Sequence, residues 1–148
     1  MRPIHLLVVI ALIGLAGCIR PPTNTREFRL TAREHPAILQ TEHLELGASY
    51  KKVLAGLQEY ATTCLNTERL VNYGPGHGNM GYVFVAEIRE TAPSKAELWY
   101  TINGAYRLVA DVEPAGGGRT KVTVYTPKQH YTESIADWGS GKPRECDY

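Results

Sequence analysis

The chain has 148 residues, about the length of one ordinary domain, so a second full domain is excluded. Sixteen Lys and Arg side chains nearly balance fifteen Asp and Glu, which excludes the basic surface that nucleic-acid binding requires. Hydrophobic residues make up 43% of the chain, which fits a folded domain and excludes a disordered or multi-span membrane protein.

The N-terminal segment has the composition of a secretion signal. Arg2 precedes an unbroken apolar run of ten residues from Leu6 to Leu15. A helix that spans a bilayer needs roughly twenty apolar residues, so this run is too short for a permanent membrane helix. We therefore predict that residues 1–17 are a signal peptide.

The end of this segment resembles the lipobox of bacterial lipoproteins at all four positions, Leu15-Ala16-Gly17-Cys18. The resemblance implies cleavage after Gly17 and acylation of Cys18, whose acyl chains would hold the protein on a membrane. In such lipoproteins an Asp directly after the acylated Cys marks retention at the inner membrane. Here that residue is Ile19, so the resemblance implies the periplasmic side of the outer membrane rather than the inner membrane.

Residues 18–40 hold three prolines and alternating charges without a sustained hydrophobic period. We expect them to comprise the acylated Cys18 and a flexible tether, with at most a short strand within residues 28–31. A single α+β domain is then expected over residues 41–148.

The domain is predicted to begin with a strand and a helix. Leu44 and Leu46 alternate with polar residues, which predicts a half-buried strand over residues 43–46. Residues 49–65 carry the strongest helical signal, with Ser49 available as N-cap. Gly56 inside this helix costs about 1 kcal/mol relative to Ala, so packing rather than propensity must stabilise it. The apolar stripe consists of Tyr50, Val53, Leu54, Leu57, Ala61, Cys64 and Leu65.

After a glycine-rich loop at residues 74–79 the hydrophobic period changes to 2, which predicts strands at residues 81–90, 96–102, 105–113 and 120–126. Asn103-Gly104 is typical of a two-residue hairpin turn, but that register would put the apolar side chains of the two strands on opposite faces. We therefore predict a three-residue loop over residues 102–104 that pairs Tyr100 with Tyr106.

A second helical signal follows the last predicted strand. Tyr131, Ile135 and Trp138 stand at positions i, i+4 and i+7 and form one apolar stripe. The element order predicts an α+β fold, a two-layer sandwich with an antiparallel sheet of four to five strands. A long N-terminal helix and a short C-terminal helix are expected on one face of the sheet.

The chain has three cysteines. With Cys18 assigned to the lipid anchor, Cys64 and Cys146 remain as one pair in an oxidising compartment, which predicts a disulfide. The bridge would join the C-terminal tail to the first helix and stabilise the fold by up to about 4.5 kcal/mol. A redox or metal-binding role is not expected, because neither cysteine belongs to a CxxC motif or to a His spacing typical of metal fingers.

No constellation typical of an enzyme, a metal site or a cofactor site is found. The serines lack a GxSxG context, and neither of the glycine-rich stretches, at residues 74–79 and 114–119, ends like a phosphate loop. The histidines of the mature chain are scattered at His35, His43, His77 and His130. Acidic residues on the strands are expected on a solvated outer face of the sheet, namely Glu87, Glu97, Asp111 and Glu113.

Two functional hypotheses remain. In the first, the domain is a non-enzymatic interaction or accessory module that docks on an envelope protein complex or another lipoprotein. It would dock through an edge strand or through the outer sheet face, where Trp99 and Tyr125 are expected. The alternative for these two aromatic residues is that they only pack across strands. In the second hypothesis, a pocket between the first helix and the sheet binds a lipid or another small apolar ligand. That pocket would be lined by Leu57, Tyr60, Leu108 and Val124.

Nearly the whole chain resembles small proteobacterial envelope lipoproteins, and the lipobox is the specific part of the resemblance. The other shared features are the Cys-containing first helix, the strand at residues 122–125 and a tail with Trp138-Gly139 followed by Cys146. The order of helix, sheet and helix also resembles helix-grip domains, such as those of the lipoprotein in the outer-membrane β-barrel assembly machinery. The resemblance implies an envelope location, and it implies no particular molecular task because a shared fold does not confer function.

Overall fold

The computed structural model describes residues 20–72 and 79–146 of the chain. The predicted signal peptide, Cys18 and most of the glycine-rich stretch at 74–79 lie outside these ranges. The described helices are α2 (Thr25–Glu34), α3 (Tyr50–Tyr60), its π-helical continuation η1 (Ala61–Leu65) and α4 (Gln129–Gly139). The strands are β1 (Gln40–Leu46), β2 (Glu68–Asn72), β3 (Asn79–Ala92), β4 (Lys95–Ile102), β5 (Ala105–Gly116) and β6 (Arg119–Thr126). Within these ranges no helix is long and apolar enough to cross a membrane.

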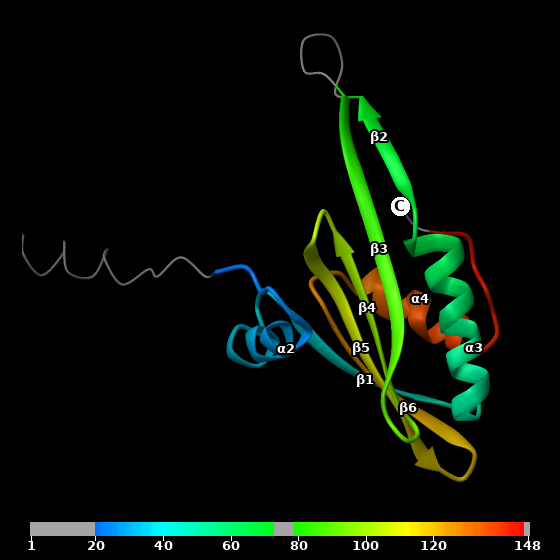
Figure 1. Cartoon of the computed structure of the whole chain (residues 1–148). Coiled ribbons are helices and arrows are strands. Elements are labelled where there is room, and N and C mark those ends of the chain that lie inside the picture. The colour runs from blue at the N-terminus through cyan, green and yellow to red at the C-terminus, as the bar shows by residue number, and fades with distance from the viewer. Residues whose placement is uncertain (1–19, 73–78, 147–148) are drawn as a thin grey trace, which may run out of the picture.

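The strands form one antiparallel sheet in the order β1-β6-β5-β4-β3-β2. Helices α3 and α4 cover one face, which we call the inner face, and α2 lies against the opposite, outer face (Figure 1). The predicted α+β class and antiparallel sheet are confirmed, and the five predicted strands correspond to β1, β3, β4, β5 and β6. The sixth strand, β2, pairs with the segment Asn79–Val83 of β3, which extends beyond β4 as an arm (Figure 1).

The predicted helix over residues 49–65 is confirmed as α3 together with η1. Ser49 stands at the N-cap position, although its side chain makes no capping hydrogen bond. The predicted stripe of α4 is also confirmed, since Tyr131, Ile135 and Trp138 are all buried. These helices close the main core over fully buried sheet residues, which include Leu98, Leu108, Val112, Val122 and Val124.

The predicted loop between β4 and β5 is wrong. Asn103 and Gly104 form a two-residue turn with φ values of 50° and 78°, and Ile102 pairs with Ala105. These positive φ values are those of a type I′ turn. The register then shifts at Arg107, an extra residue in β5, so that Tyr100 pairs with Leu108. This β-bulge returns the apolar side chains of both strands to the inner face, which removes the objection to the two-residue turn.

The prediction of a flexible tether is wrong for residues 25–34, which form α2. Asn24 caps this helix by accepting a hydrogen bond from the backbone N–H of Glu27 at 2.9 Å. The carboxylate of Glu27 in turn accepts a hydrogen bond from the backbone N–H of Thr23 at 2.8 Å. Two reciprocal bonds of this kind satisfy backbone donors at a helix start. The fold therefore has a partial third layer that the predicted two-layer sandwich lacks.

Helices α3 and α4 approach each other so closely that one position admits only glycine. A methyl group at Gly56 would lie 2.1 Å from the carbonyl oxygen of Trp138, which is far inside van der Waals contact. Gly56 therefore lowers the helix propensity of α3, but its lack of a side chain permits the close helix contact that buries Trp138 and Ile135.

We predict that Gly56→Ala destabilises the protein by about 2 kcal/mol, because the two helices must separate to admit the methyl group. Intrinsic helix propensity alone predicts the opposite sign, a gain of about 1 kcal/mol. Urea unfolding followed by circular dichroism measures the difference. Gly47→Ala is the matched control, since nothing lies within 4 Å of a methyl group there. A Gly56→Ala protein as stable as the control would contradict the close contact.

Candidate functional site

The outer face carries a second, smaller core beneath α2. Phe28 and Ala32 of α2 pack with Leu39 and with Val109 of β5, and none of the four is more than 5% exposed. Phe28 and Ala32 are four residues apart, which places them on the same side of the helix. This second core holds α2 on the sheet. The helix covers the outer face at Val109 of β5 and leaves the outer face of β3 open at Val83 and Val85.

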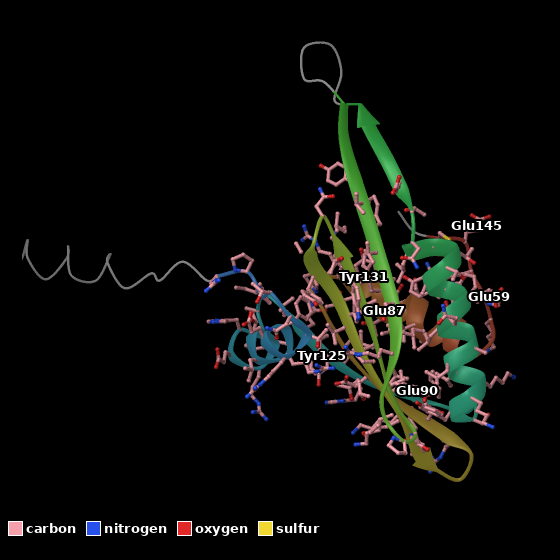
Figure 2. All side chains as sticks on the ribbon, viewed as in Figure 1. Glu59, Glu87, Glu90, Tyr125, Tyr131 and Glu145 are labelled. Atoms are coloured by element: carbon pink, nitrogen blue, oxygen red, sulfur yellow. A yellow bond between two sulfur atoms is a disulfide. The ribbon has the colours of Figure 1, made fainter. Side chains whose placement is uncertain are left out.

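Trp99 and Tyr125, the predicted interaction surface, lie at the margin of this second core and are partly buried. The ring centroid of Trp99 is 6.1 Å from that of Tyr106, in an edge-on arrangement. Tyr125 lies beside α2 (Figure 2), and the guanidinium carbon of Arg29 stands 5.9 Å from its ring centroid. Burial and the charge of Asp111 raise the pKa of the Tyr125 phenol. Much of the predicted surface is thus occupied by the chain's own helix.

An ion-pair cluster joins α2 to the sheet. Nε of Arg29 donates to a carboxylate oxygen of Asp111 at 2.9 Å, and Nη2 of Arg29 donates to both Asp111 and Glu97. Arg89 of β3 approaches the second carboxylate oxygen of Glu97 at 3.4 Å. The side chain of Glu97 is only 4% exposed, so these cations supply the counter-charge that its burial requires. The expectation that Glu97 is solvated is therefore wrong.

The electrostatics of Arg29 follow from this geometry. Burial lowers the pKa of the guanidinium, but the hydrogen bonds to Asp111 and Glu97 raise it by more, so the pKa lies above its ordinary value. Two donor nitrogens in a planar fork fix the orientation of the side chain as well as its charge. Arg29 is consequently a fixed cation beneath α2.

A hollow of about 530 Å³ opens between α2, β1 and β6 beside this cluster. We call it the arginine hollow, because its lining includes three arginines of α2. It is formed by Arg26, Arg29, Leu30 and Arg33 of α2, Thr41 and His43 of β1, and Tyr125 of β6. None of these lining side chains carries a carboxylate. Asp111 and Glu97 balance the charge of Arg29, so the positive charge that the arginine hollow presents to an incoming molecule comes from Arg26 and Arg33.

A neighbouring hollow of about 420 Å³ has mixed polarity and shares His43 and Tyr125 with the arginine hollow. Glu113 in its lining lies 3.2 Å from Lys95 and 3.4 Å from Lys121. Hydrogen bonds from these two ammonium groups lower the pKa of the Glu113 carboxyl. Because its charges are already paired within the protein, this hollow offers an incoming ion little.

The predicted ligand pocket coincides with the main core. Leu57, Leu108 and Val124 have no exposed surface, and Tyr60 is 4% exposed. All four belong to one cluster of buried residues, and none lines either hollow described above. The structure places these four residues in the packed main core and not around either hollow.

The predicted disulfide is confirmed. Cys64 of η1 and Cys146 of the C-terminal tail form a bridge with a Cα to Cα distance of 5.3 Å across 82 residues of sequence. The bridge holds the tail beside α3 (Figure 1). A closed loop of this length limits the unfolded chain strongly, so the bridge has the expected structural role.

The arginine hollow and its ion-pair cluster are the features that sequence reasoning missed. The available signal was Asn24 followed by Glu27, which is typical of a helix start. A helix from that point places Arg26, Arg29 and Arg33 on one side through their i, i+3 and i+7 spacing. Of the four acidic residues expected to be solvated, Glu87 is exposed, and Asp111 and Glu113 are partly exposed.

Comparison with models of known protein families and with curated proteins gives no match to this chain.

We predict that Arg29→Met destabilises the protein by about 3 kcal/mol, because it leaves the buried Glu97 carboxylate with Arg89 as its remaining cation. Thermal unfolding followed by calorimetry measures the loss. Arg26→Met is the matched control on the same helix, since Arg26 is exposed and its replacement should change stability by no more than about 0.5 kcal/mol. Equal melting temperatures for the two variants would show that the cluster does not hold α2 on the sheet.

Proposed function

We propose that the chain is a membrane-anchored bacterial envelope lipoprotein whose domain serves as a non-enzymatic interaction or accessory module. The observation that carries the proposal is the partition of the cysteines. Of the three in the chain, Cys64 and Cys146 pair with each other, and Cys18 remains within the lipobox-like sequence Leu15-Ala16-Gly17-Cys18. A disulfide in the domain is typical of an oxidising compartment such as the periplasm. Ile19 after Cys18 favours the periplasmic side of the outer membrane.

We expect the full-length protein, produced in a bacterium fed with labelled palmitate, to incorporate the label, and Cys18→Ser to abolish incorporation. The acyl chains attach to the sulfur and the amine of residue 18, so no other residue replaces it. The matched control is the double variant Cys64→Ser with Cys146→Ser, which removes two thiols and should retain the label. An unlabelled wild-type protein, or a labelled Cys18→Ser variant, would overturn the anchor.

The part of the outer face on β3 that α2 does not cover is a better candidate for the interaction surface than the predicted pair Trp99 and Tyr125. Val83 is 49% exposed and Val85 is 39% exposed. Alternate residues of a strand share a face, so these two valines and the exposed Glu87 point to the same side. Exposed apolar neighbours of this kind support a protein contact.

We expect a photo-crosslinking residue at position 87 to capture a defined envelope protein in intact cells, and the double variant Val83→Ser with Val85→Ser to reduce that product at least tenfold. Loss of a packed apolar contact at the centre of an interface accounts for a reduction of this size. Ile38→Ser is the control, because Ile38 is 51% exposed and lies in another part of the chain. A product of equal yield from both variants would exclude this surface.

A further inference from the structure

The arginine hollow contains positive charge that the fold does not use. Arg29 is committed to Glu97 and Asp111, whereas Arg26 and Arg33 form no ion pair among the described residues. Both side chains are exposed and line the same hollow as Arg29. The two uncommitted guanidinium groups of Arg26 and Arg33 are suited to an oxyanion, because each can donate two parallel hydrogen bonds to it.

The acidic residues of α2 lie on a different side of the helix. Glu27 and Glu34 line a separate hollow together with Arg20, Pro21 and Pro22. The two hollows share one residue, Leu30, which is 42% exposed and stands between them. The charges of α2 are thus separated into a basic side toward β1 and an acidic side toward residues 20–22, which lead into the helix.

The position of the arginine hollow is set relative to residue 18. Arg20 contributes to the hollow that adjoins the arginine hollow across Leu30. Two residues of fully extended chain span no more than about 7 Å, so Cys18 cannot lie far from Arg20. With Cys18 acylated, a membrane surface would lie at this end of α2, and the exposed Leu30 would face it.

We propose that the arginine hollow binds the phosphate headgroup of an anionic phospholipid in the membrane that holds Cys18. This inference rests on the proposed function, since it takes the lipid surface from the acyl anchor. Arg26 and Arg33 would bind the phosphate oxygens, and the fixed guanidinium of Arg29 would form the floor of the site beside the ring of Tyr125. Leu30 would contact the interfacial region of the bilayer. The acyl chains would hold the protein on the membrane, and the headgroup would fix its orientation there.

Vesicle binding by an unacylated chain tests the headgroup site separately from the anchor. A chain that starts at residue 19 keeps every element the structure describes and has no acyl group. We expect it to sediment with vesicles of phosphatidylcholine and phosphatidylglycerol, and not with vesicles of phosphatidylcholine alone. The double variant Arg26→Gln with Arg33→Gln should bind the anionic vesicles about thirtyfold more weakly, as expected for two basic side chains at a charged membrane surface.

The matched control is Lys51→Gln with Lys52→Gln, which removes the same charge from exposed positions of α3 and should bind like the wild-type chain. An equal loss of vesicle binding in both double variants would show that binding depends on net charge alone, and it would overturn the site. Glycerol phosphate provides a second arm. If it protects the wild-type chain against thermal unfolding while anionic vesicles do not bind, the site takes a soluble phosphate ester and the lipid proposal is wrong.

The two proposals fail separately. Absence of palmitate on Cys18 together with Arg26-dependent and Arg33-dependent vesicle binding would overturn the anchor alone. Normal acylation together with vesicle binding that is indifferent to these arginines would overturn the headgroup site alone.

Discussion

The buried carboxylate of Glu97 is the constraint on which the arrangement of the outer face depends. A charge with 4% exposure needs a fixed counter-charge, and Arg29 supplies it from a helix 68 positions earlier in the sequence. That ion pair and the second core together hold α2 on the sheet in one rotation about its axis. With Arg29 turned inward, Phe28 and Ala32 close the second core. The same rotation directs the two remaining arginines of α2 into the hollow beside β1. The interaction that stabilises the helix therefore also creates the site proposed for the lipid headgroup.

On the inner face the corresponding constraint is shape rather than charge. Gly56 allows α3 to contact the backbone of α4 at Trp138, and the bulge at Arg107 keeps the side chains of β4 and β5 on one face. The disulfide joins the tail to the same helix layer. These features leave the main core closely packed around Leu57 and Leu108, both without exposed surface. Among the described residues, the inner side thus carries the packed main core, whereas the arginine hollow and the exposed Val83 and Val85 belong to the outer side.

The parts of this fold that sequence could predict are those that depend on local periodicity. The helix over residues 49–65, five strands and the stripe of α4 follow from hydrophobic spacing alone, and the cysteine pair follows from elimination. The turn at Asn103-Gly104 was misjudged because the parity argument assumes a regular ladder, and a single bulged residue reverses it. Helix α2 was not predicted, because only two of its apolar residues are buried and they give no sustained hydrophobic period. Its partner Glu97 is 68 positions away, and no local pattern reveals an ion pair across that separation.

Helix α2 also limits how far the domain can be from its proposed anchor. The tether predicted from sequence extends to residue 40, but the folded region begins at Thr25. The chain from Cys18 to Thr25 spans at most about 25 Å when fully extended. With Cys18 acylated, the first residue of α2 must remain within that distance of the bilayer, so the domain could not move freely away from the membrane. A partner that contacts Val83 and Val85 would then bind a domain that is held near the membrane surface.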